Sequence, residues 1–77
     1  MDHGMRYRVT RGDDDRHPTG FSKFEAAEAA ARDESEASPL KTAYIHLTQN
    51  GQWLATYING RLKRCDLSAI ADAMADQ

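Results

Sequence analysis

An Asn-Gly pair between two alternating runs constrains the fold of this chain more than any other feature. Asn50 and Gly51 separate TAYIHLTQ (42–49) from QWLATYI (52–58). Asn-Gly in this setting is typical of a β-hairpin, because both central residues of a type I′ turn adopt positive φ. Cross-strand partners share a face of the sheet. With a two-residue loop, the predicted aliphatic face is Ile45, Leu47, Leu54 and Thr56, and the predicted aromatic face is Tyr44, His46, Trp53 and Tyr57.

The segment before the hairpin predicts a strand, a loop and a helix. Residues 5–10, MRYRVT, alternate with the period of a half-buried strand, and residues 11–20 are expected to form an open loop. Residues 23–34 are strong helix formers, with Ser22 as the expected N-cap and Glu25 completing a capping box. The face of this helix that is expected to pack on the sheet carries Phe24, Ala27 and Ala31.

The segment after the hairpin predicts a third hairpin strand and a short helix. Asn59-Gly60 begins a second turn, for which two registers are open. A two-residue loop pairs Tyr57 with Leu62, whereas a three-residue loop pairs Tyr57 with Arg61. We prefer the second register, because it keeps Leu62 on the aliphatic face. Asp66 can cap a final helix with an apolar stripe at helical spacing, namely Leu67, Ile70, Ala71 and Met74.

These elements predict an α+β fold for residues 1–77 as a single small domain, with residues 1–4 as a disordered tail. The architecture is a two-layer sandwich, in which an antiparallel sheet of three or four strands carries one long helix on one face. A short helix follows at the C-terminus, so the order is β-α-β-β-(β)-α. The pattern contains no diagnostic family motif. The expected core is Met5, Tyr7, Val9, Phe21, Phe24, Ile45, Leu47, Leu54 and Leu62.

The residues that could carry chemistry do not form a recognisable site. The three aspartates that follow Arg11-Gly12 fail the calcium-loop template, which requires glycine at its sixth position and glutamate at its twelfth. A solvated loop is therefore the preferred interpretation, over weak binding of a divalent ion or an RGD recognition tripeptide. His3, His17, His46 and Cys65 lack the spacing of zinc ligands, and no base is placed to activate the thiol. We expect no catalytic activity, no metal and no cofactor.

Composition adds expectations about the cellular compartment and about charge. Cys65 is the only cysteine, and no apolar run approaches the ~20 residues of a membrane span. We therefore expect a soluble, cytoplasmic protein without membrane partners. The net charge of −2 hides an alternation, because residues 13–36 carry −5 and residues 37–64 carry +4 with no acidic residue. A folded molecule with two oppositely charged faces follows from this pattern.

Two surfaces are candidates for binding a partner. The first is the aromatic and basic sheet face, which combines residue types that are enriched at interface hot spots: Arg6, Arg8, Tyr44, His46, Trp53, Tyr57 and Arg61. The second is an acidic helix face that could occupy a basic groove of a partner: Glu25, Glu28, Asp33, Glu34 and Glu36.

The favoured function is that of a protein-binding module, an adaptor or a stoichiometric inhibitor of a protein or protein complex. Phage and mobile-element proteins that block host defence complexes, anti-CRISPR proteins among them, share this size and lack of chemistry, which is an analogy of size alone. The alternative is single-stranded nucleic-acid binding, with bases stacked on the sheet face and arginines on phosphates. A homodimer that buries the aromatic face would make that face structural.

Overall fold

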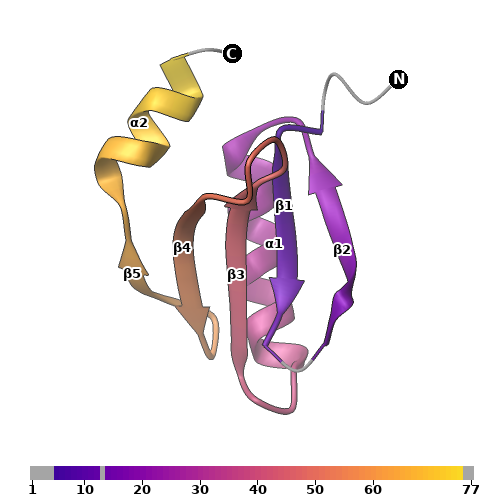
Figure 1. Ribbon diagram of the computed structural model, residues 1–77. Coiled ribbons are helices and arrows are strands. Elements are labelled where there is room, and N and C mark those ends of the chain that lie inside the picture. Colours follow the sequence, from indigo (N-terminus) through magenta and orange to yellow (C-terminus); the bar gives the residue numbers. More distant parts are fainter. Residues whose placement is uncertain (1–4, 13, 76–77) are drawn as a thin grey trace.

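The protein forms one antiparallel sheet of five strands with two helices (Figure 1). The computed structural model describes residues 5–12 and 14–75, with the backbone alone at residues 14–17. The strands lie in the order β2-β1-β3-β4-β5. The α+β class is therefore as expected, and the strand number is higher than predicted. The strands are β1 (Tyr7–Arg11), β2 (Asp14–Phe21), β3 (Thr42–Leu47), β4 (Trp53–Ile58) and β5 (Arg61–Cys65), and the helices are α1 (Phe24–Ala37) and α2 (Leu67–Ala75).

The additional strand is β2, which occupies most of the segment that was expected to be a loop. It pairs with β1 from Tyr7↔Phe21 to Arg11↔Asp14, with one irregularity in the register. It is an edge strand, and Pro18 is compatible with that position because an edge strand leaves some backbone groups without ladder partners. The loop prediction for this segment is wrong. Asp13 and the side chains of residues 14–17, which include the other two aspartates, lie outside the described part of the chain.

Helix α1 begins one residue later than expected and ends where proline requires. Its N-cap is Lys23, without a side-chain capping bond, so the predicted Ser22 capping box is wrong. The helix ends before Ser38-Pro39, because the residue that precedes proline disfavours the helical conformation. Its packing face was predicted correctly: Ala27 and Ala31 are fully buried, and so is Ser35, which continues the same stripe.

The sequence predicted a two-residue type I′ turn at Asn50-Gly51 and a longer loop at Asn59-Gly60, and the structure shows the longer loop first and the two-residue turn second. At the first turn only Gly51 has positive φ, and Leu47 bonds both Gly51 and Gln52 through its backbone, which closes a four-residue loop. At the second turn Asn59 (φ 51°) and Gly60 (φ 82°) both have positive φ, and Ile58 pairs with Arg61. The type I′ hairpin is therefore the second one, and the three-residue register that we preferred for it is wrong.

The longer first loop and an adjacent β-bulge change the register between β3 and β4. Ala43 pairs with Tyr57, Ile45 with Ala55, and His46 with Trp53, with the bulge between the last two pairs. Tyr57 therefore lies on the same face as Ile45 and is fully buried. Thr56 moves to the opposite face, where it pairs with Tyr44. The aliphatic and aromatic faces of the hairpin are thus only partly as predicted.

The core lies between α1 and the sheet and is rich in alanine. The largest fully buried side chains are Tyr7, Tyr57, Ile45 and Leu54, and they pack among six buried alanines. The ring of Phe24 meets that of Tyr7 edge-on at 5.6 Å between centroids. The prediction that Met5 and Leu62 belong to the core is wrong, because their side chains are 45% and 44% exposed. The buried alanines are Ala27, Ala31, Ala43, Ala55, Ala69 and Ala73.

Helix α2 is capped as expected but buries a different side. Asp66 accepts the backbone N–H of Ala69 at 3.0 Å through Oδ1, which confirms the predicted cap. The helix buries Ala69 and Ala73, and these small side chains allow a close approach to the core. Of the predicted stripe, Leu67, Ala71 and Met74 are exposed and Ile70 is half-buried, so that prediction is wrong. Neither helix of the described structure is long and apolar enough to cross a membrane.

Candidate functional site

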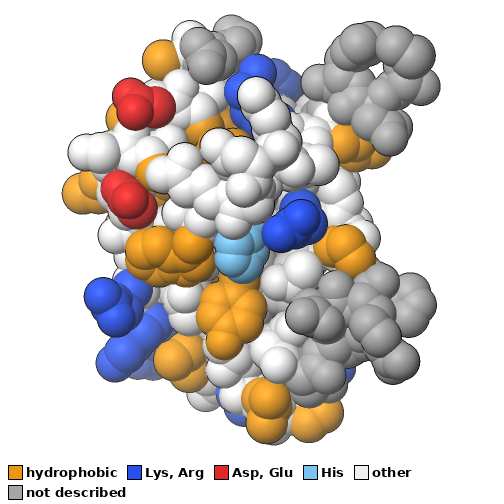
Figure 2. Space-filling view, in the orientation of Figure 1, with side chains coloured by type: hydrophobic (Ala, Val, Ile, Leu, Met, Phe, Trp, Pro, Cys, Tyr) orange, Lys and Arg blue, Asp and Glu red, His pale blue; other side chains and the backbone are white. Residues whose placement is uncertain are grey.

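The sheet has one face that α1 leaves uncovered, which we call the open face. In Figure 1 the helix α1 lies behind the sheet, and the viewer looks onto the open face. The same orientation in Figure 2 shows hydrophobic side chains and a histidine gathered over β3 and β4, with Lys or Arg side chains beside them and near β5. The acidic side chains visible in this view lie over α2. The described part of the open face is therefore aromatic at its centre, with basic side chains beside the centre and near β5.

Strand register places the side chains of the open face in rows across the sheet. The first row is Arg8, His46 and Trp53, from β1, β3 and β4. The second row is Thr10, Tyr44, Thr56 and Arg64, which extends to β5. The third row contains Thr42, Ile58 and Arg61. Neighbouring strands lie about 4.8 Å apart, so the residues of each row form one continuous surface.

A hollow of about 570 Å³ opens at the centre of this face. Its walls include Arg8, Tyr44, His46 and Trp53, with Thr10 and Pro18 on the β2 side. This volume lies within the range of about 300–1,000 Å³ that small-molecule sites occupy. The hollow therefore brings together four of the residues that the sequence assigned to the aromatic and basic face.

The indole of Trp53 is held along its own strand. Its Nε1–H donates to Thr56 Oγ1 at 2.9 Å, three residues further along β4. A bond to a side chain three residues further along the same strand holds the indole along the strand instead of letting it project away from the sheet. Because the only donor of the indole is used within the chain, the ring offers a partner its apolar π surface.

His46 contributes a neutral ring to the centre of the site. Burial lowers its pKa, and the positive charge of Arg8 lowers the pKa further, so the imidazole is uncharged at neutral pH. Its Nδ1 is buried without a hydrogen-bond partner in the described structure. The ring lies tilted against Tyr44, with centroids 6.2 Å apart and an interplanar angle of 52°. Together with Trp53, these side chains form three adjacent ring surfaces.

Tyr57 does not belong to the open face, which corrects its predicted placement. It is buried under α1, where its hydroxyl donates to Glu28 Oε2 at 3.0 Å and the Arg32 guanidinium lies 5.2 Å from its ring centroid. Burial raises its pKa, and the bond to Glu28 raises it further. The physical reason is the β-bulge between the pairs His46↔Trp53 and Ile45↔Ala55, which places Tyr57 opposite Ala43 instead of Tyr44.

The basic residues at the margins of the open face are only partly those predicted. Arg61 lies on this face at the far row, and Arg64, which the sequence analysis missed, lies in the same row as Tyr44. The position of Arg64 depends on the two-residue turn at Asn59-Gly60 and on a β-bulge that follows it, and the sequence analysis anticipated neither. Arg6 directly precedes β1, is half-buried, and accepts the backbone N–H of Thr48 at its own carbonyl.

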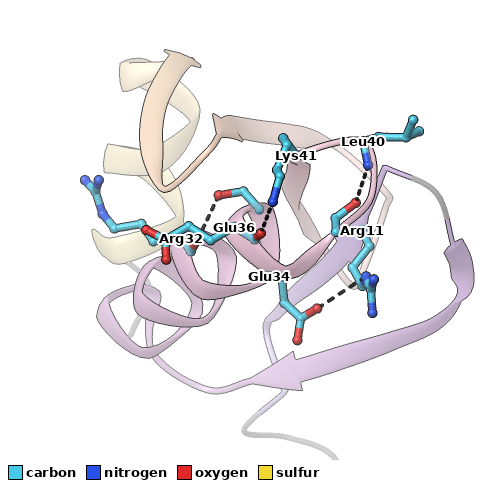
Figure 3. Close-up of polar contacts among 8 residues, drawn as sticks. Arg11, Arg32, Glu34, Glu36, Leu40 and Lys41 are labelled. Carbon is cyan, nitrogen blue, oxygen red and sulfur yellow. Dashed lines mark hydrogen bonds and ion pairs between the residues drawn. The ribbon is translucent and has the colours of Figure 1, made fainter.

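The predicted acidic helix face is partly neutralised within the molecule. Glu34 pairs with Arg11 Nε at 3.6 Å (Figure 3), and Glu28 pairs with Arg32 at 3.4 Å. The remaining three carboxylates are exposed on α1: Glu25, Asp33 and Glu36.

A polar cluster fixes α1 to the turn between β4 and β5. The Ser35 hydroxyl accepts the backbone N–H of Gly60 at 2.7 Å and donates to the Arg32 carbonyl at 2.8 Å. Arg32 Nη1 donates to the Gly60 carbonyl at 3.0 Å. Both backbone groups of Gly60 are thereby satisfied by side chains of the helix.

Metal-binding and nucleophilic groups are dispersed. Within the described residues, no three of His, Cys, Asp and Glu lie close enough together to hold a metal ion. His3 and the side chain of His17 lie outside the described part of the chain. Cys65 is a half-buried free thiol at the end of β5. Comparison with protein-family models, curated proteins and solved structures found no match to this chain.

Proposed function

We propose that this chain is a non-catalytic binding module that recognises a larger partner through its open face, as an adaptor or a stoichiometric inhibitor does. The observation that carries the proposal is the central hollow, where two aromatic side chains, a neutral imidazole and a guanidinium meet on a face that α1 leaves uncovered. Tyr, Trp and Arg are the residue types that dominate the binding energy of interfaces.

The dimensions of the molecule are sufficient for such a contact. Its two longer dimensions are 33 and 26 Å, and their product of about 860 Å² approximates the area of one broad face. Each partner of a standard interface contributes about 800 Å². Binding a single partner would therefore use most of one face. The exposed carboxylates of α1 lie on the other side of the molecule, where they orient an approaching charged partner rather than contact it.

Charge argues for a different molecule as the partner instead of a second copy of this chain. A face-to-face homodimer is isologous, so each copy presents the same residues to the other. Such a dimer would gather Arg8, Arg61 and Arg64 of both copies in one interface, and the strands that carry them contain no acidic residue to offset these charges. A partner with negative charge avoids this repulsion. A protein or protein complex with an acidic segment and a single-stranded nucleic acid both meet this condition.

Affinity capture with surface variants tests the proposal. The full chain is immobilised and exposed to an extract of the native host, and bound protein and nucleic acid are quantified separately. Trp53→Ala and Tyr44→Ala should release the specifically bound partner. Leu67→Ala is the matched control, since it truncates a side chain that is 74% exposed on α2. Capture that is unchanged by both open-face variants, or equally reduced by the control, would refute the assignment of this surface.

A further inference from the structure

The open face differs from the rest of the molecule in its charge. Strands β1, β3, β4 and β5 contain no aspartate or glutamate. Arg8, Arg61 and Arg64 lie on the open face by register, and within the described residues no ion pair engages them. The protein as a whole is acidic, but the charged side chains that the register places on this face from β1 and β5 are cationic. A negatively charged ligand fits this face.

The rings on this face lie next to one another. A tryptophan that anchors a protein interface typically enters a pocket of the partner. Trp53 is instead held along β4 by its bond to Thr56, so its indole does not project away from the sheet. His46 and Tyr44 continue this surface next to Trp53. Planar groups of about the same width stack well on such a surface, and nucleobases are planar groups that stack on aromatic side chains without regard to sequence.

We propose that the hollow binds a single-stranded nucleic acid, with one base stacked on Trp53 and its neighbouring rings and with phosphates near the three arginines. This inference rests on the proposed function of the open face and names the class of its partner. A duplex is excluded from this contact, because its bases are stacked on one another and are not free to enter the hollow.

The charge layout determines how binding depends on salt. For single strands, the logarithm of the affinity falls with the logarithm of the salt concentration with a slope of about −0.7 for each neutralised phosphate. Three phosphates at Arg8, Arg61 and Arg64 give a slope of about −2. Raising the salt from 50 to 200 mM should therefore weaken binding by about 20-fold.

Fluorescence titration tests the proposal directly, because Trp53 is the only tryptophan. Oligothymidylate of twelve nucleotides is added to the full chain at 20 mM salt, and we expect saturable quenching of Trp53 with the salt dependence given above. The same duplexed sequence should bind at least 10-fold more weakly. An acidic peptide, poly-glutamate of equal charge, serves as the protein-like probe.

Variants separate the specific site from general charge attraction. Arg8→Gln and Arg64→Gln should each weaken oligothymidylate binding several-fold. Lys23→Gln removes the same charge from an exposed position before α1 and should leave binding within 2-fold. Trp53→Ala, measured by anisotropy of a labelled oligonucleotide, should weaken binding by roughly 5- to 100-fold. Circular dichroism spectra identical to that of the unmodified chain show that each variant is folded.

The outcomes distinguish this inference from the proposed function. Absence of quenching by oligothymidylate at 20 mM salt overturns the nucleic-acid inference. Tighter binding of poly-glutamate than of oligothymidylate also overturns it, and the partner is then an acidic protein segment. In both cases the capture experiment with Trp53→Ala still decides whether the open face is the contact surface.

Discussion

Replacement of Ser35 by alanine should destabilise the protein substantially, although alanine is the better helix former. Ser35 is fully buried, and its hydroxyl is the acceptor for the Gly60 amide at 2.7 Å. In Ser35→Ala the Gly60 N–H remains in the same partly buried place without an acceptor, which costs about 2 kcal/mol. The higher helix propensity of alanine offsets about 0.5 kcal/mol of that loss. The net expectation is a loss of about 1.5 kcal/mol.

Thermal and chemical unfolding measure this loss. For a domain of this size, about 1.5 kcal/mol corresponds to a decrease in Tm of roughly 6–12 °C. Ser22→Ala is the matched control, because Ser22 is exposed and α1 begins after Lys23 without a side-chain cap. Its effect should stay within about 0.5 kcal/mol. In addition, the Gly60 amide of Ser35→Ala should exchange with solvent faster than that of the unmodified chain.

The reasoning is refuted if the two serine variants unfold at the same temperature. Equal stability would mean that Gly60 finds another acceptor or water, so that the contact between α1 and the β4–β5 turn contributes little. The opposite result, a large loss at Ser22, would restore the capping box that the sequence predicted at the start of α1.

Three further predictions concern polar groups elsewhere. Tyr57→Phe removes the hydrogen bond to Glu28 and should lower the free energy of unfolding by about 1 kcal/mol, because the carboxylate is half-exposed and the bond is weakened by solvent. Tyr44→Phe on the open face is the control and should leave the free energy of unfolding unchanged. The folded-state pKa of His46 is lowered, so the unfolded chain binds more protons than the folded chain below about pH 6.5. The denaturant concentration at the unfolding midpoint should therefore fall as the pH decreases through that region. His46→Gln should remove this part of the dependence of stability on pH. Asp66→Ala removes the N-cap of α2 and should cost about 1 kcal/mol, visible as faster amide exchange within α2, while Asp66→Asn should retain most of the stability.

The sequence predicted the central elements of the fold because their signals are local. The β3–β4 hairpin, the alanine face of α1 and the Asp66 cap each depend on residues close together in the chain. Strand β2 escaped prediction because it is a polar edge strand, which is stabilised by backbone pairing with β1 and not by a periodic apolar face. Nothing in its side-chain pattern distinguishes it from a loop.

The side chains that fill the core under α1 depend on the volume available between the helix and the sheet. A local sequence pattern does not report that volume. The helix and strands β3 and β4 each contribute alanine to the interface, for example Ala31 and Ala55. Small side chains leave space that large ones must fill. Tyr7 and Tyr57 fill it, and the β-bulge between β3 and β4 turns Tyr57 to the covered face of the sheet. The aromatic pattern alone could not separate this tyrosine from Tyr44, which remains on the open face.

The candidate site was predictable to the extent that its residues are fixed by alternation. Arg8, His46 and Trp53 alternate with buried residues in their strands, and all three line the hollow. Arg64 was missed because its position depends on a turn and on the β-bulge that follows it. The internal pairing of Glu34 with Arg11 joins residues far apart in the chain, so the acidic face was overestimated.

The two borders of the sheet have a consequence for how the protein behaves at high concentration. Proline in β2 leaves one border without a full set of backbone donors, and three cationic side chains line the other border along β5. Lateral addition of a further chain, the step by which sheets grow into fibrils, is unfavourable at both borders. Concentrated solutions of this protein should therefore stay clear and free of fibrils. For the same reason a partner is expected to bind the broad surface of the sheet instead of its edge strands.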